Sequence, residues 1–256
     1  MQNRGNAGKN KKTVLIIAIA LLLVLALALG GFTFAKYISQ GNGSDSARVA
    51  AWGFTVEAGG DNAAGFNTQY ANDTSEVIVR ANGSSKVVAP GTSGQFNFSI
   101  SGTAEVAAEV TFSLAYTSDI GLPLTPSEGG EAITYNPIRF TLNKDNSPVE
   151  EDLTLAELKT ALEEIRVEVK PNESYTANYT ITWAWAFDGN YFHADESVDT
   201  TAENGISCDV LDTLLGQGKN YGTVEIGEDD YYTVGTPETD IAFDLTVSVG
   251  QINDLA

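Results

Sequence analysis

Apolar and polar residues alternate along most of the chain, which is the pattern of β-strands that bury one face. The clearest runs are 106–116, 175–187 and 241–249, where every second residue is aliphatic or aromatic. Shorter runs occur at 77–79, 95–101, 138–142, 166–170, 223–226 and 231–234. Gly, Asn and Pro separate many of these runs, so the pattern predicts strands that are joined by turns.

One segment, Leu155–Ile165, has helical spacing instead. Its apolar residues fall on one helical face: Leu155, Leu158, Leu162 and Ile165. Thr154 and Glu157 have the spacing of a capping box, in which each side chain satisfies a free N–H group of the first turn. We therefore predict one amphipathic helix whose role is packing.

Strands of this kind with one inserted helix and no internal repeat predict an all-β chain. We expect one antiparallel, jelly-roll-like β-sandwich over residues 47–256. Its first strand is predicted at Ala47–Val56, where apolar residues on both faces could be buried. The acidic segment Tyr191–Gly222 is predicted to be mostly irregular, with one helical turn at Asp209–Leu215.

The N-terminus has the pattern of a secretory signal peptide. A basic tip, residues 1–12, precedes the uncharged run Thr13–Ala35. Small residues, Thr33 and Ala35, lie three and one positions before a predicted cut at Lys36. The signal helix thus occupies 1–35, and a flexible Gly/Ser-containing junction follows at 36–46. An uncleaved anchor is the alternative, because the run is long enough to span a bilayer. Either case predicts a secreted protein of the extracellular matrix or cell surface.

The charge balance excludes one class of partner. The chain has 14 Lys and Arg against 34 Asp and Glu. The leader holds four of the basic residues and none of the acidic ones, so its removal leaves 10 against 34, a net charge of −24. Such a surface repels nucleic acid and anionic lipid headgroups, and the predicted membrane contact is confined to the leader.

The residues needed for common catalytic sites are scarce. The chain has one histidine, His193, and one cysteine, Cys208. A zinc hydrolase of the His-Glu-x-x-His type needs two histidines one helical turn apart, and a disulfide needs two cysteines. A catalytic triad would have to use His193, which has no nucleophile elbow. We predict no catalytic residue, no cofactor and no metal centre.

Acidic side chains crowd one part of the chain. They are Asp195, Glu196, Asp199, Glu203, Asp209 and Asp212. Carboxylates are the ligands that calcium prefers. Their spacing matches no EF-hand, and a solvated acidic surface is the other interpretation.

Two tryptophans, Trp183 and Trp185, share the apolar face of the run 175–187. Exposed indole rings in this arrangement could stack on sugars. Because five further apolar residues lie on the same face, we predict that both rings belong to the core.

Several motifs resemble those of one family. The junction FAKYISQGNGSDSARVAAWGF (34–54) is similar to the leader and first strand of exported Gram-positive proteins that the SipW signal peptidase processes, the TasA and camelysin group. Further similar segments are PGTSG (90–94) with FNFSISG (96–102), YTITWAWAF (179–187) and DTLLG (212–216).

The resemblance implies a secreted, non-enzymatic fibre subunit of the biofilm matrix. It implies that the segment after the cut completes the sheet of the next subunit, with these residues in the assembly strand: Arg48, Val49, Ala50, Trp52 and Phe54. The implied partners are further copies of the chain, a dedicated signal peptidase and an accessory matrix protein.

Three alternatives stay open. The segment Ala47–Val56 could instead be an ordinary first strand of its own sheet. Camelysins have also been classed as metallopeptidases, an activity for which this chain shows no motif. The chain could also be a surface module that binds calcium or sugar.

Overall fold

A computed structural model describes residues 48–58, 65–71, 75–226 and 231–253. The predicted signal peptide, its cut at Thr33, Ala35 and Lys36, and the junction lie outside these ranges. By its internal contacts the chain divides into two units, Met1–Ala51 and Trp52–Ala256. Of the first unit only residues 48–51 are described, and they form no strand. The fold below is that of the second unit.

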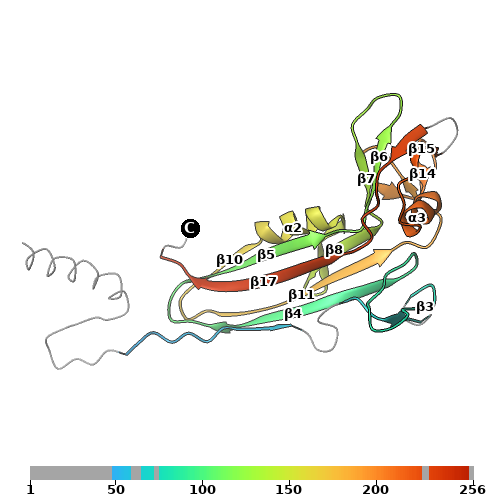
Figure 1. Ribbon diagram of the computed structural model, residues 1–256. Helices are drawn as coiled ribbons and strands as arrows, with labels where there is room; N and C mark the ends of the chain where they lie inside the picture. The colour runs from blue at the N-terminus through green and yellow to red at the C-terminus, as the bar shows by residue number, and fades with distance from the viewer. Residues whose placement is uncertain (1–47, 59–64, 72–74, 227–230, 254–256) are drawn as a thin grey trace, which may run out of the picture. The chain divides into compact units, whose positions relative to one another are not determined.

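Two antiparallel sheets form a β-sandwich (Figure 1). The larger has the strand order β1-β4-β11-β8-β9, and the smaller has the order β10-β5-β17. Their bounds are Thr55–Ala58 (β1), Ser93–Thr103 (β4), Ala108–Ser118 (β5), Ile138–Lys144 (β8), Ser147–Leu153 (β9), Arg166–Val169 (β10), Ser174–Trp185 (β11) and Ala242–Gln251 (β17). The predicted all-β sandwich is thus confirmed.

The remaining elements lie at one end of the sandwich, where β5 and β11 end and β17 begins (Figure 1). One sheet has the order β15-β16-β6-β7 and another β13-β12-β14. The bounds are Leu122–Pro126 (β6), Ile133–Tyr135 (β7), Tyr191–Phe192 (β12), Val198–Asp199 (β13), Ile206–Ser207 (β14), Cys208–Gly216 (α3), Gly222–Glu225 (β15) and Tyr231–Val234 (β16). We call these elements the apical lobe. A short hairpin, β2 (Gln69–Tyr70) with β3 (Val79–Arg80), completes the described fold.

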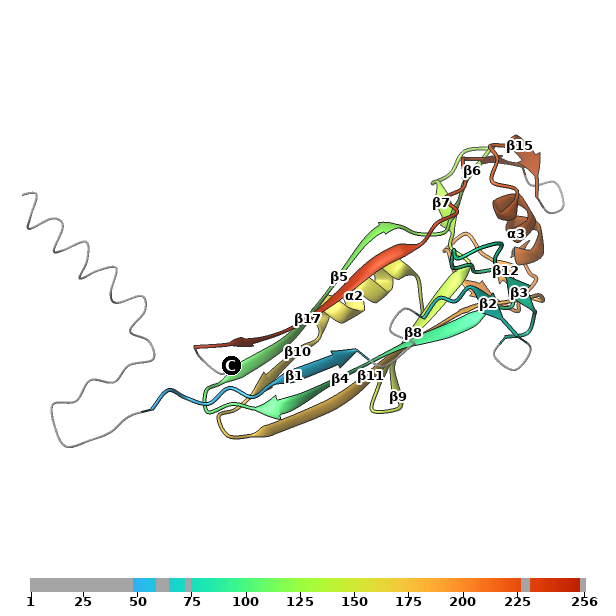
Figure 2. The ribbon, with the colours of Figure 1, turned by 60° about the horizontal axis from the view of Figure 1, so that its bottom comes forward.

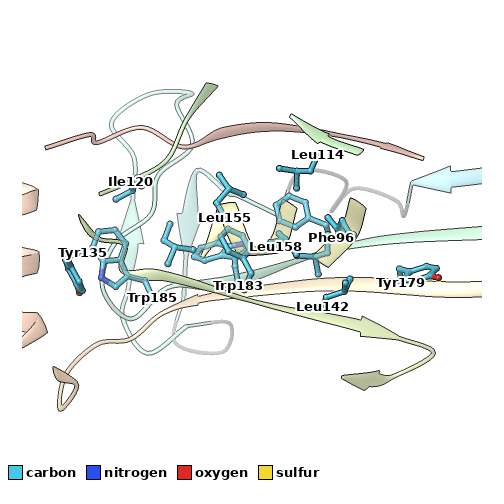
Figure 3. Packing of buried hydrophobic residues seen from close by; sticks show 14 of the residues in the cluster. Phe96, Leu114, Ile120, Tyr135, Leu142, Leu155, Leu158, Tyr179, Trp183 and Trp185 are labelled. Carbon is cyan, nitrogen blue, oxygen red and sulfur yellow. The ribbon is translucent and has the colours of Figure 1, made fainter. Parts of the chain in front are cut away.

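The core contains most of the residues that the alternating pattern assigned to it (Figure 3). Tyr116 and Phe187, which fall on the same faces at the ends of their runs, are exposed instead. In β11 the buried face holds Tyr179, Ile181 and both tryptophans. Trp183 is 2% exposed and Trp185 is 7% exposed, so the prediction that they belong to the core is confirmed.

The predicted helix is α2, Leu155–Glu164. Its capping box forms as expected, because Thr154 accepts from the N–H of Glu157 and the Glu157 carboxylate accepts from the N–H of Thr154. Its three leucines, Leu155, Leu158 and Leu162, are fully buried. The helix packs against β5, β8 and β9, and so covers one long side of the sandwich (Figure 2).

Two sequence predictions are corrected. The first strand is not Ala47–Val56: β1 starts at Thr55, and before it only Trp52 makes an isolated bridge, to Ala104. The predicted burial of both faces is also wrong, because Val49, Trp52 and Val56 are 67%, 45% and 42% exposed.

The region 191–222 is more regular than predicted and contains a second helix, α3. Its strands have two residues each, which is too short for an alternating pattern to show.

Candidate functional site

β17 is an edge strand of unusual length. It pairs with β5 on one side, and no described strand pairs with it on the other. Natural edges are usually short, or carry Lys, Pro or bulges that prevent another strand from pairing with them. β17 has ten residues, with Asp244 as its one charged side chain and no proline, and its register shift lies at its start, between Ala242 and Phe243. Its main chain is therefore open to an additional strand.

An apolar groove of about 530 Å³ runs beside this edge. It lies between β17 and the opposite sheet, and its apolar lining includes Phe66, Phe96, Phe98, Ile181, Phe243 and Leu245. Lys86 and Asp244 are the charged residues of its lining. The inward side chains of β17 are only partly buried. A strand that added to β17 could therefore also cover apolar surface with its own side chains.

Phe66 closes one end of the groove. Its ring lies 5.7 Å from Phe96 and 5.1 Å from Trp183, between ring centroids. The preceding carbonyl, Gly65 O, accepts a hydrogen bond from Nε1 of Trp183 (3.1 Å). A Cβ at Gly94 would lie 2.2 Å from this oxygen. Glycine at 94 is therefore needed for residues 65 and 66 to enter the space between the sheets.

The N-terminal segment enters the sandwich at the end of β4 and then borders the groove, because Val56 of β1 is part of the groove lining. The N–H of Gly53 donates to Thr103 O (3.0 Å), at the end of β4. Gly102 permits this approach, because a Cβ there would lie 2.5 Å from Gly53 O. The groove residue Phe96 lies seven positions before Thr103 on the same strand, which is roughly 23 Å at about 3.3 Å per residue. The chain thus enters at one end of the sandwich, and the groove extends from β1 along β4 as far as Phe96.

The structure divides the five predicted assembly residues into two groups. Trp52 and Phe54 belong to the sandwich unit, where their rings lie 5.4 Å apart and Phe54 packs against the core. Arg48, Val49 and Ala50 belong to the first unit and form no strand.

His193 lies in the apical lobe without the partners of a catalytic triad. Its Nε2 is 3.1 Å from Oδ1 of Asp199. The hydroxyl of Ser197 donates to Asp195 (2.6 Å), and this bond is the first cause that lowers the pKa of Asp195. These residues therefore do not form the hydrogen-bonded series of nucleophile, histidine and acid that a catalytic triad needs.

The acidic residues predicted as possible calcium ligands accept separate, local hydrogen bonds. Asp199 accepts from the N–H of Thr201 (2.6 Å), and Glu196 accepts from the N–H of Thr134 (2.8 Å). Within the described ranges, no three His, Cys, Asp or Glu side chains are grouped as metal ligands.

Asp212 has a different environment from the other acids of this region. Its Oδ1 accepts from the hydroxyl of Tyr135 (2.8 Å) and from Nε1 of Trp185 (3.0 Å). Burial raises the pKa of Asp212 to about 6 and that of the neighbouring Cys208 thiol to about 11. The sequence analysis missed this cluster. One available signal was Trp185, since a buried indole N–H needs an acceptor.

Comparisons of the chain with protein-family models, curated proteins and solved structures found no match. Neither described helix has the length and apolar character needed to cross a membrane.

Proposed function

We propose that the protein is an exported structural subunit that assembles into fibres by strand addition. The segment that follows the signal peptide of one copy would pair with the free edge of β17 in the next copy. The observation that carries this proposal is β17 itself, a ten-residue edge with one charge and no proline beside an apolar groove. Main-chain pairing gives the affinity, and apolar side chains in the groove give the register.

The positions of the two surfaces favour a chain of copies over a closed pair. The donated segment leaves the sandwich near Thr103, and the groove lies at Phe96 and Phe98. A contact between two different surfaces is heterologous, and it extends without limit unless a rotation closes it. The product of such a contact is a filament.

The resemblance to the TasA and camelysin group supports the same proposal, and with it export through a dedicated signal peptidase and deposition in the matrix with an accessory protein. The residues of the donated strand would be Arg48, Val49 and Ala50, with Trp52 and Phe54 at its root. The role is structural and uses no cofactor.

Electron microscopy of the mature protein, which starts at Lys36, tests the proposal. We expect filaments from this protein and none from a version that lacks residues 36–51, which keeps β1 and the Gly53 hydrogen bond. Val247→Lys, which places a charge in the groove, should also abolish filaments. Thr160→Lys, on the exposed face of α2, which packs against β5, β8 and β9, is the matched control and should leave them intact.

Mixing two defective proteins gives a sharper test. The version without residues 36–51 keeps only the acceptor groove, and the Val247→Lys variant keeps only the donor segment. We expect a one-to-one complex that does not grow, visible by analytical ultracentrifugation. Filaments from the truncated version alone would disprove the proposal.

A further inference from the structure

One carboxylate, that of Asp212, gives helix α3 hydrogen bonds to the sandwich in addition to its apolar packing. Asp212 lies on the face of α3 that also buries Leu211 and Leu215. Its Oδ1 is the acceptor for Tyr135 of β7 and for Trp185 at the end of β11. Figure 3 shows Tyr135 and Trp185 at the same end of the core. One oxygen therefore connects three elements.

Both donors to this oxygen are uncharged. The titratable groups that interact with Asp212 are Tyr135, Cys208 and Asp209, and the cation Arg139 acts on Cys208. Lys86 lines a cavity together with Trp185 and Leu215. The guanidinium of Arg139 donates to Glu196 O (2.6 Å) and lies 3.8 Å from Asp152. The negative charge of Asp212 is thus partly buried with hydrogen bonds but without an ion pair of its own.

Because of this arrangement, the protonation state of Asp212 affects how stably α3 packs against the sandwich. A partly buried carboxylate without a cation favours its neutral form. Burial raises the pKa of Asp212 in the folded chain to about 6, above the ordinary value of 3.8. The folded state therefore binds the proton more tightly than the unfolded state does. The resulting stabilisation is complete below pH 3.8 and is lost as the pH rises through about 6.

We propose that Asp212 makes α3 a pH-sensitive latch of the apical lobe, which closes in mild acid and loosens at neutral pH. The latch adjoins a second cavity, of about 380 Å³, that Leu215 and Gly216 of α3 line together with Phe66 and Ile241. Loosening of α3 would therefore change the packing of residues beside the groove of β17. The latch is a property of one chain and does not depend on assembly.

Cys208 provides the measurement, because it is the one cysteine of the chain and is 5% exposed at the start of α3. The version without residues 36–51 is treated with a thiol reagent from about pH 5 to about pH 7.5. Each rate is divided by the rate for the urea-unfolded protein at the same pH, which removes the intrinsic pH dependence of the thiol. We expect protection to fall by about tenfold as the pH rises, since the starting pH lies about one unit below the pKa and one pKa unit corresponds to a tenfold change.

Two isosteric variants decide the outcome. Asp212→Asn keeps an acceptor oxygen but cannot ionise, so its protection should not vary with pH. Asp209→Asn removes one of the charges that raise the pKa of Asp212, so it should keep the pH dependence but move it to slightly lower pH. His193→Asn should also leave the pH dependence intact, because His193 bonds to Asp199. Constant protection in the unmodified chain, or an unchanged pH dependence in Asp212→Asn, would overturn the proposal. If Asp212→Asn fails to fold, hydrogen exchange of the α3 amides in the unmodified chain gives the same test.

Discussion

The two long sides of the sandwich differ in how they are closed. On one side α2 packs between the sheets, and both flanking edges are protected. β9 contains Pro148 and three acidic residues and has register shifts, and β10 has four residues, two of them charged. On the other side no described helix covers the space between β1 and β17, and the groove remains. A protected edge cannot pair with a further strand. The open side is therefore the one suited to receive a strand.

Among these substitutions, the largest loss of stability should follow the truncation of a leucine of α2 on the closed side. Leu158 is fully buried, so Leu158→Ala loses contacts and leaves a cavity. We expect the free energy of unfolding to fall by about 3 kcal/mol in chemical denaturation. Thr160→Ala, on the exposed face of α2, is the control and should change it by less than about 0.5 kcal/mol.

Gly94→Ala tests whether Phe66 is needed to close the end of the groove. The new methyl group would meet Gly65 O, so residues 65 and 66 must move out of the core. We expect a loss of about 2 kcal/mol and a change in the tryptophan fluorescence of Trp183. Gly250→Ala should do neither, because nothing lies within 4 Å of a Cβ there. An unperturbed Gly94→Ala protein would show that this closure is dispensable.

Leu245→Ala measures how much the packing around the groove stabilises a single copy of the chain. The side chain faces the groove and is only partly buried, so its truncation in the version without residues 36–51 should cost about 1.5 kcal/mol. The same substitution should cost more in assembled protein, where a neighbour covers it. A loss equal to that of Leu158→Ala in the isolated chain would mean that the two sides are equally closed.

The smallest effect is expected at the helix cap. Thr154→Ala removes one half of the capping box and should cost about 1 kcal/mol at pH 7. The pKa of Glu157 is lowered first by the N–H of Thr154, which Thr154→Ala keeps, and also by the Thr154 hydroxyl, which it removes. The contribution of the hydroxyl is present above pH 4.5 and fades as the carboxylate is protonated. Denaturation at about pH 3.5 should therefore show a smaller effect of Thr154→Ala than at pH 7.

Much of the closed side could be predicted from the sequence. Period-two and helical patterns extend over many residues in β5, β11 and α2, and the capping box is local, so Thr154 and Glu157 identified it. The bounds of the first strand could not be predicted in this way. Trp52 and Val56 have the spacing of a buried face, but they lie beyond the end of β4 or at its edge, where little covers them.

The groove itself was not predicted. The inward residues Phe243 and Leu245 were recognised as one face of a strand, but whether a strand lies at an edge depends on the order of strands in the sheet. That order results from contacts distant in sequence, such as the pairing of β17 with β5. The cluster at Asp212 depends in the same way on Tyr135, which lies 77 positions earlier.

The offset along β4 between Thr103 and Phe96 would set the spacing between copies in the proposed fibre. In a fibre formed by the proposed strand addition, each copy would hold the next at a distance fixed by hydrogen-bonded sheet, since both reference points belong to the same strand. A polymer built in this way would have a constant axial repeat, which fibre diffraction or image averaging would record as a single sharp periodicity.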